Sequence, residues 1–283
     1  EEGFGLVFLE AMRAGKACIG GTGAAAEVIE DGVTGLVVDA AEPGEIEKAV
    51  VRLFLEPETR DRMGRAGAER LAANITALSG GRLTIKVYAA GELVPALECF
   101  GAVANGTAQL GHDASYYHLG KTEGAPFFTA FPFGFTTAEM DAWVKYGNGQ
   151  KLWDELYAPF GIRAFHAGST GTQMFGWFRK EIRSLADLQG LKFRAPGNQG
   201  RVLQKLGVTP VTLPGGEIFP ALQSSAIDGA EWIGPYNDLA LGFYQVCKHY
   251  YAPGYHEPGP NLQLMINERA WRTLTPDLQA IVR

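Results

Sequence analysis

Short apolar strands alternate with helices over the last three quarters of the chain. Residues 192–195, 209–213 and 228–233 have the pattern of strands, and helical patterns separate them. The earlier run RLTIKVY (82–88) also alternates as a strand does, and residues 137–157 have the pattern of a long helix. Strands that alternate with helices usually form a sheet whose faces the helices cover, so this rhythm indicates an α/β protein of one or two lobes. The 283 residues are about twice the length of an ordinary domain, which fits one large or two modest domains.

The first 66 residues differ from the rest in charge. They contain 7 Lys or Arg and 13 Asp or Glu, whereas the remainder holds 18 of each, so the net charge of −6 belongs to this segment. Its αβαβα pattern contains two short strands, too few to bury both faces of a parallel sheet. We therefore expect a division into a fragment over 1–66 and a main domain over 67–283.

Composition excludes several classes of protein. The net charge of −6 argues against a nucleic-acid partner, which usually requires a basic face. Three cysteines are too few for a disulfide framework or a zinc site, and the five histidines show no paired ligand spacing. The chain begins EEGFGLVFLEAM, without a signal peptide, and ends within a helical pattern. We expect a chain truncated at both ends.

A glycine turn opens the first helix. Glu2 precedes this turn, which contains Gly3 and Gly5, and Glu10 follows eight residues after Glu2. Such a turn presents free N–H groups to an anion such as a diphosphate. The runs EEGFGLVFLEAMRAGK and GGTGAAAEVIEDGVTGLVV resemble the donor-binding part of retaining GT-B glycosyltransferases of the family 4 type. The resemblance implies that both glutamates contact a nucleotide sugar; a packing role is the alternative that we favour, because that family's acceptor domain is absent.

Three later segments place polar residues within or at the end of short apolar strands, where an open α/β sheet binds its ligands. These residues are Gln173 in IRAFHAGSTGTQMFGWF, Arg194 and Asn198 in LKFRAPGNQG, and Glu231 and Trp232 in AIDGAEWIGP.

A charged side chain at an apolar strand end needs a partner. For Arg194 the candidates are Glu231, in a buried ion pair, and the carboxylate of a ligand, which a planar guanidinium binds well. The oxygen atoms of Glu231 and Gln173 are hard donors that suit Na⁺ or Ca²⁺ better than zinc. A cation held there would be shared with a carboxylate ligand.

From about Ala68 to Arg283 the chain resembles the solute-binding proteins of TRAP (tripartite ATP-independent periplasmic) transporters, in the subtype for 2-oxo and 2-hydroxy monocarboxylates. The matching runs are SGGRLTIKVYAAGELVPALECFGAVANGTAQLGH and LKFRAPGNQGRVLQKLGVTPVTLPGGEIFPALQSSAIDGAEW. The resemblance implies a two-lobed periplasmic-binding-protein-like fold, here incomplete, that closes on its ligand by a hinge.

The same resemblance implies roles for these residues. Arg194 would bind the ligand carboxylate, and a Na⁺ or Ca²⁺ ion that bridges to the ligand would be held by Gln173, Glu231 and the backbone carbonyl of Trp232.

The resemblance also implies contacts from the other lobe and partners. Tyr116 or Tyr117 would approach the ligand from that lobe, and Asn198 would contact it directly or through a neighbour. The expected protein is not an enzyme. It is periplasmic, captures a carboxylate such as pyruvate or lactate, delivers it to the small and large membrane subunits of a transporter, and forms a possible homodimer. The alternatives are a glycosyltransferase that uses a nucleotide-sugar donor and a hybrid chain without a working site.

Overall fold

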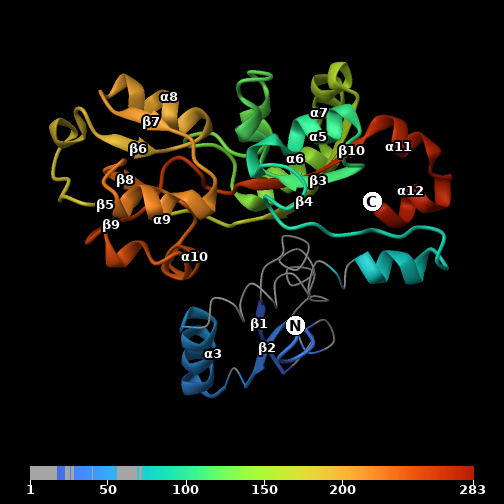
Figure 1. Ribbon diagram of the computed structural model, residues 1–283, viewed down its shortest axis with the longest axis horizontal. Helices are drawn as coiled ribbons and strands as arrows, with labels where there is room; N and C mark the ends of the chain where they lie inside the picture. Colours follow the sequence, from blue (N-terminus) through green and yellow to red (C-terminus); the bar gives the residue numbers. More distant parts are fainter. Residues whose placement is uncertain (1–17, 23–25, 27–28, 40, 56–68, 70–71) are drawn as a thin grey trace. The chain divides into compact units, whose positions relative to one another are not determined.

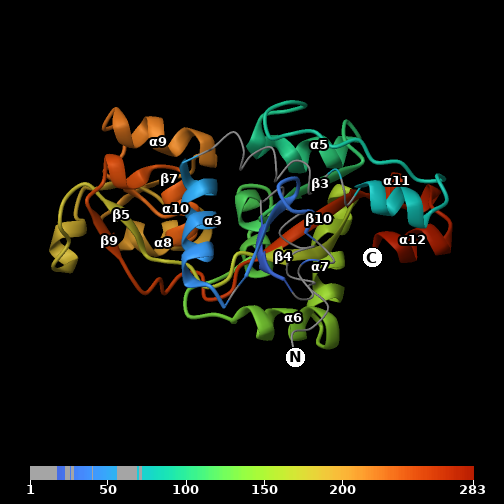
Figure 2. The same cartoon turned by 90° about the horizontal axis from the view of Figure 1, so that it is seen from below.

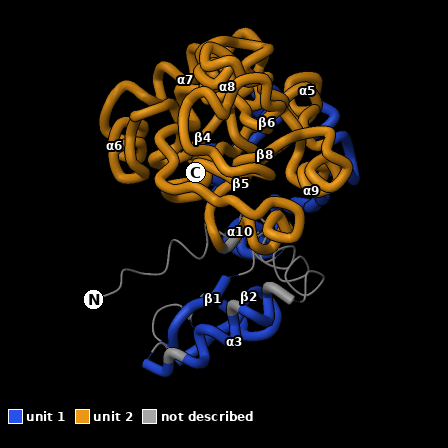
Figure 3. The backbone as a smooth tube through the Cα atoms, turned by 90° about the vertical axis from the view of Figure 1, so that its left-hand side faces the viewer, with its two compact units in different colours: residues 1–95, 106–109, 266–283 blue, residues 96–105, 110–265 orange. Residues whose placement is uncertain are grey.

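The structure is a computed structural model of the chain, and it describes residues 18–22, 26, 29–39, 41–55, 69 and 72–283. The chain forms two compact units, shown in different colours in Figure 3. Unit 1 comprises Glu1–Pro95, Gly106–Gln109 and Ile266–Arg283, and unit 2 comprises Ala96–Asn105 and Leu110–Met265. Among the described residues, no helix combines the length and the apolar character needed to cross a membrane.

Helices and strands alternate along most of the described chain (Figures 1 and 2). The strands are β1 Cys18–Gly21, β2 Gly35–Val38, β3 Leu110–Asp113, β4 Ile162–Ser169, β5 Gly176–Phe178, β6 Lys192–Arg194, β7 Thr209–Val211, β8 Gly229–Ala230, β9 His249–Tyr251 and β10 Asn261–Asn267. The labelled α-helices are α3 Pro43–Leu55, α5 Cys99–Asn105, α6 Thr137–Tyr146, α7 Gly149–Tyr157, α8 Gly197–Lys205, α9 Gly215–Gln223, α10 Pro235–Ala240, α11 Glu268–Thr273 and α12 Pro276–Val282, and residues 72–78 are also helical. The 3₁₀ turn η2 Ser115–His118 carries two of the candidate residues.

Unit 1 contains a small parallel sheet in which β1 pairs with β2. Helix α3 packs on it through Leu53, which is fully buried against Leu36. Gly35 is required there because a Cβ at this position would lie 2.4 Å from the carbonyl oxygen of Cys18. These elements agree with the pattern expected for the acidic segment, but Glu2 and Glu10 lie outside the described residues.

The five-stranded sheet of unit 2 brings two candidate residues together. Its order is β7-β6-β8-β5-β9, with β6 parallel to both β7 and β8. Arg194 is in register with Ala230, and the N–H of Glu231 donates to the carbonyl of Arg194 at 3.2 Å. Because parallel strands end at the same edge of a sheet, Arg194 and Glu231 meet at the carboxyl edge.

The second sheet has the order β3-β10-β4, and α5, α6 and α7 accompany it (Figures 1 and 2). The ring of the fully buried Trp153 stacks on Phe128, with centroids 4.9 Å apart. The helical pattern expected over residues 137–157 is divided into α6 and α7. The first helix ends before Gly147, whose backbone is extended (φ −97°, ψ −152°), and the second begins at Gly149 after Asn148.

One expected strand is not formed. The run RLTIKVY keeps the alternating burial of a strand, with Leu83, Ile85 and Val87 half-buried, yet the described structure assigns residues 83–89 to neither helix nor strand. A strand requires a hydrogen-bonded neighbour, and alternation in the sequence reports only the extended backbone. The three sheets and the helices between their strands, over the described residues, nevertheless agree with the α/β class expected from the sequence.

The packing of α8 gives a test of the core of unit 2. Leu203 is 1% exposed and belongs to the cluster that includes Phe178 and Phe193, whereas its neighbour Val202 is 36% exposed. Leu203→Ala should lower the free energy of unfolding by about 2–5 kcal/mol, because it removes buried methyl groups and leaves a cavity. Val202→Ala should lower it by less than about 1 kcal/mol. Chemical denaturation measures both, and equal losses would contradict this packing.

Candidate functional site

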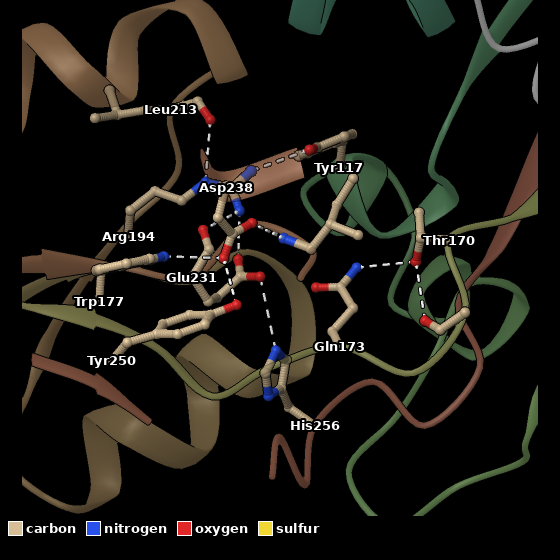
Figure 4. A network of polar contacts seen from close by, with 12 residues as sticks. Tyr117, Thr170, Gln173, Trp177, Arg194, Leu213, Glu231, Asp238, Tyr250 and His256 are labelled. Carbon is tan, nitrogen blue, oxygen red and sulfur yellow. Dashed lines mark hydrogen bonds and ion pairs between the residues drawn. The ribbon is translucent and has the colours of Figure 1, made fainter. Parts of the chain in front are cut away.

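Arg194 lies at the centre of the candidate site and is completely buried. Its Nη1 donates to the carboxylate of Glu231 and, at 3.2 Å, to the carbonyl of the same residue (Figure 4). Its Nε donates to the carbonyl of Leu213 at 3.2 Å, and its Nη2 donates to the hydroxyl of Tyr117 at 3.0 Å. The ring centroid of Trp232 lies 5.1 Å from the guanidinium carbon. The guanidinium is thus held from three separate parts of the chain.

The ion pair keeps Arg194 charged despite its burial. Burial is the largest single effect and opposes the charge, but Glu231 together with Tyr117 and Tyr116 outweighs it, so the pKa of the guanidinium lies above its ordinary value. Of the two partners expected for Arg194, Glu231 is the one in contact in this structure. A ligand carboxylate at the same guanidinium stays a prediction.

Several buried polar atoms near Glu231 have no hydrogen-bond partner in the described part of the chain. They are Oε1 of Gln173, Oε2 of Glu231, both ring nitrogens of His256 and Oε2 of Glu257. Ligand atoms of Glu231, His256 and Glu257 lie within 4.8 Å of one another, and Nε2 of His256 is 3.6 Å from Oε2 of Glu231. Each unsatisfied buried group costs about 1–3 kcal/mol, so this cluster has the properties of a ligand or cation site.

The amide oxygen of Gln173 has no hydrogen-bond partner within the described ranges of the chain. The side-chain nitrogen donates to Oγ1 of Thr170 at 3.1 Å, which leaves Oε1 on the side of the amide that faces Glu231 (Figure 4). Its backbone N–H donates to the carbonyl of Glu257 at 3.0 Å. An amide oxygen and carboxylate oxygens are the donors that Na⁺ and Ca²⁺ prefer, so the residues present fit such a cation.

The structure adds Glu257 and His256, which the sequence analysis missed. Burial, followed by the negative charge of Glu231, raises the pKa of the Glu257 carboxyl well above its usual range, and Arg194 opposes the rise. The spacing of the histidines carried no signal for His256. The sequence offered one signal for this segment, which is the charged Glu257 inside the otherwise uncharged run YHEPGPN.

The remaining candidates lie on η2 and α8. Tyr116 packs edge-on against Tyr117, with ring centroids 4.7 Å apart, and burial raises the pKa of both hydroxyls. Tyr116 also lies against Gly197, where a Cβ would come within 2.9 Å of the tyrosine Cβ. Asn198 is half-buried in the first turn of α8. Its role stays a prediction.

Asp238 supports the turn that carries Glu231 and Trp232. Its Oδ1 accepts the N–H of Ile233 at 2.9 Å, and its Oδ2 accepts Nε1 of Trp177 and the hydroxyl of Tyr250, each at 3.0 Å (Figure 4). Burial raises the pKa of this carboxyl to about 6. The carboxylate therefore gathers three donors just behind the site.

The greater part of the chain, residues 58–283, matches the sequence profile of the family described as bacterial extracellular solute-binding protein, family 7. A curated relative, the monocarboxylate 2-oxoacid-binding periplasmic protein of Nostoc sp., is 46% identical over 217 residues. That match covers 77% of this chain and 60% of the relative, so the chain spans less than two thirds of the relative's length.

Two solved structures share the fold. A TRAP transporter solute-binding protein of Bordetella bronchiseptica, described as a dimer with calcium and picolinate bound, is 42% identical with a TM-score of 0.74, over 76% of this chain and 64% of that one. A TRAP periplasmic solute-binding protein of Pseudoalteromonas atlantica, with bound sodium and pyruvate, is 46% identical with a TM-score of 0.73, over 75% and 64% of the two chains. These similarities confirm the expected fold class.

The N-terminal segment has a separate relationship. Residues 1–70 match the profile described as glycosyl transferases group 1. A GDP-mannose-dependent mannosyltransferase of Mycobacterium tuberculosis is 41% identical over 73 residues, which are 25% of this chain and 19% of that enzyme.

The buried ion pair gives a test of the site's energetics. Arg194→Met should lower the free energy of unfolding by about 3–5 kcal/mol, because it leaves the charge of Glu231 buried without its partner. The double variant Arg194→Met with Glu231→Gln should recover part of this loss, since neither charge remains. Urea denaturation of the two single variants and the double variant measures the coupling. Strictly additive losses would contradict a buried pair.

Asp238 gives a test by pH. Its pKa of about 6 in the folded protein exceeds the ordinary 3.8, so between these values the folded state binds more protons than the unfolded state. The free energy of unfolding contributed by this group should therefore decrease as the pH rises from about 4 to 6. The difference in unfolding free energy between the wild type and Asp238→Asn, measured across that window, should follow the decrease. A constant difference would refute it.

Proposed function

The chain belongs to family 7 of the bacterial extracellular solute-binding proteins, and on that premise we propose that it captures a small 2-oxo or 2-hydroxy monocarboxylate such as pyruvate or lactate. It would do so in the periplasm and deliver the acid to the small and large membrane subunits of a TRAP transporter. The members of this family are binding receptors rather than enzymes. The observation that carries the proposal is the buried Arg194 beside oxygen atoms of Gln173 and Glu231 that have no hydrogen-bond partner among the described residues.

In this proposal Arg194 binds the ligand carboxylate. Its guanidinium is planar, permanently charged and held from several sides, so it is pre-organised to orient a two-oxygen anion. Tyr117 already contacts the guanidinium through its hydroxyl, which puts that hydroxyl within reach of the same anion. Tyr116 and Asn198 would shape the surroundings of the ligand.

A cation would complete the site. We assign its ligands to Oε1 of Gln173, Oε2 of Glu231 and the backbone carbonyl of Trp232, with Glu257 and His256 beside them. A Na⁺ or Ca²⁺ ion would offset the negative charges that Glu231 and the ligand bring into a buried place. The support comes from the unpartnered amide oxygen of Gln173 and from the two solved relatives, one described with sodium and pyruvate and the other with calcium.

The N-terminal match supports a second, weaker candidate. Glycosyl transfer would require the donor contacts of Glu2 and Glu10, which lie outside the described residues, and the match spans 19% of the mannosyltransferase. The profiles of the two families overlap over residues 58–70, close to the boundary expected at 66/67. We propose that 1–66 is a separate fragment, that 67–283 carries the binding function, and that two copies can form a homodimer as in the Bordetella relative.

A thermal-shift titration tests the proposed function. Pyruvate, lactate or 2-oxobutyrate, added with Na⁺ or Ca²⁺ at about 100 times the dissociation constant, should stabilise the protein by about 2.7 kcal/mol. Arg194→Lys should abolish most of this stabilisation, because an ammonium group keeps the charge but loses the planar two-pronged contact. Arg201→Lys, at an exposed arginine on α8, is the matched control and should respond as the wild type does.

Gln173→Ala tests the binding of the cation separately from the binding of the acid. The variant should need a higher concentration of Na⁺ or Ca²⁺ to show the same stabilisation by pyruvate. Stabilisation by UDP or GDP, with none by any of the acids, would favour the glycosyltransferase instead. Failure of the chain to melt cooperatively would favour a hybrid without a working site.

A further inference from the structure

The peptide group between Trp232 and Ile233 is oriented from outside the site. Oδ1 of Asp238 accepts the Ile233 N–H at 2.9 Å. That N–H shares one planar peptide unit with the carbonyl of Trp232, and the bond between them is trans. In a trans peptide the N–H and the C=O point in opposite directions. The carbonyl of Trp232 therefore points away from Asp238.

The following peptide group is held as well. The carbonyl of Ile233 accepts the N–H of Met174 at 2.9 Å, and Met174 directly follows Gln173. The carbonyl of Gln173 in turn accepts the N–H of Gly254 at 3.2 Å. Backbone hydrogen bonds thus join the turn after β8 to the segment that carries Gln173, so two of the proposed cation ligands cannot move independently.

Asp238 is itself rigidly held. The side chain is 1% exposed, and its Oδ2 accepts hydrogen bonds from Trp177 on β5 and Tyr250 on β9. These two residues are paired across the sheet and their rings are stacked, with centroids 4.1 Å apart. The backbone N–H of Asp238 donates to the carbonyl of Gly234 at 2.9 Å, in the first turn of α10. The carboxylate that orients the Trp232–Ile233 peptide is therefore fixed by two strands and its own helix.

We propose that Asp238 is a positioning residue for the cation site: it aims the Trp232 carbonyl at the cation and strengthens it as a ligand. An ionised acceptor on the N–H polarises the peptide group, which makes the carbonyl oxygen at its other end more negative. A more negative carbonyl is a better ligand for a hard cation. The inference rests on the proposed function, because it concerns the cation of that site.

Asp238→Asn tests the inference. Asparagine has the same shape, but one of its oxygens is replaced by an NH₂ group, so it cannot accept all three hydrogen bonds. Isothermal titration with Ca²⁺ or Na⁺ in the presence of pyruvate should show a roughly tenfold weaker cation affinity. Pyruvate affinity at saturating cation should stay close to that of the wild type, because Asp238 does not touch the guanidinium of Arg194.

Asp228→Asn is the matched control. Oδ2 of Asp228 accepts the backbone N–H of Lys192 at 2.8 Å, so this substitution also removes a carboxylate that holds the same sheet, at a place away from the cation. It should alter stability without altering cation affinity. Equal losses of cation affinity in the Asp238 and Asp228 variants would show a general structural effect and overturn the inference.

A luminescence measurement distinguishes positioning from loss of stability. Tb³⁺ is an oxygen-seeking ion similar in size to Ca²⁺, and its lifetimes in H₂O and D₂O report the number of bound waters. Loss of the Trp232 carbonyl should add about one water in Asp238→Asn. Tyr250→Phe keeps the carboxylate of Asp238 but removes one of the hydrogen bonds that hold it, so it should give a smaller loss of cation affinity. This variant replaces Asp238→Asn in the test if Asp238→Asn does not fold.

The possible failures are distinct. Unchanged cation affinity and an unchanged water count in Asp238→Asn, or in Tyr250→Phe if the first variant does not fold, would overturn the positioning role and leave the proposed function intact. A wild-type protein that binds pyruvate without any cation would overturn the proposed cation site and this inference, but not the capture of the acid. A wild-type protein that binds neither would overturn the proposed function and this inference with it.

Discussion

The buried ion pair between Arg194 and Glu231 is the constraint on which the rest of the site depends. Taking a guanidinium and a carboxylate out of water costs several kcal/mol each, and their attraction repays this only if the remaining donors and acceptors are also satisfied. For Arg194 most of them are, since Leu213 accepts from its Nε and Tyr117 accepts from its Nη2. For Glu231 they are not, because its Oε2 has no hydrogen-bond partner among the described residues. A bound cation would satisfy the oxygen atom of Glu231 that lacks a partner, and this supports the interpretation of a binding site for a cation and an anion.

The ladder between β6 and β8 makes this ion pair possible. Parallel pairing of Arg194 with Ala230 puts the next residue, Glu231, at the carboxyl edge beside the arginine. The turn after β8 is then linked to Gln173 and Asp238 by backbone and carboxylate hydrogen bonds. The proposed cation ligands come from distant parts of the chain, and main-chain hydrogen bonds hold them in place before a ligand binds. The site therefore loses little flexibility on binding.

Much of this was predictable from the sequence, and the exceptions share a cause. Arg194 and Glu231 were evident because a charge at the end of an apolar strand requires a partner. His256 and Glu257 were missed because they lie in a loop without periodicity, and only folding brings them to Glu231. The strand expected in RLTIKVY was wrong because alternation predicts an extended backbone but does not supply its neighbour.

The sequence by itself determined the α/β class, the distinct acidic segment over 1–66 and the types of side chain that the site uses, because periodicity, charge and residue chemistry are local properties. The tertiary structure alone decided which partner Arg194 takes, which oxygen atoms are left without one, and where Asp238 lies behind the Trp232–Ile233 peptide. These are contacts between residues far apart in the chain. Their geometry is settled by strand register and backbone hydrogen bonds, which no local pattern encodes.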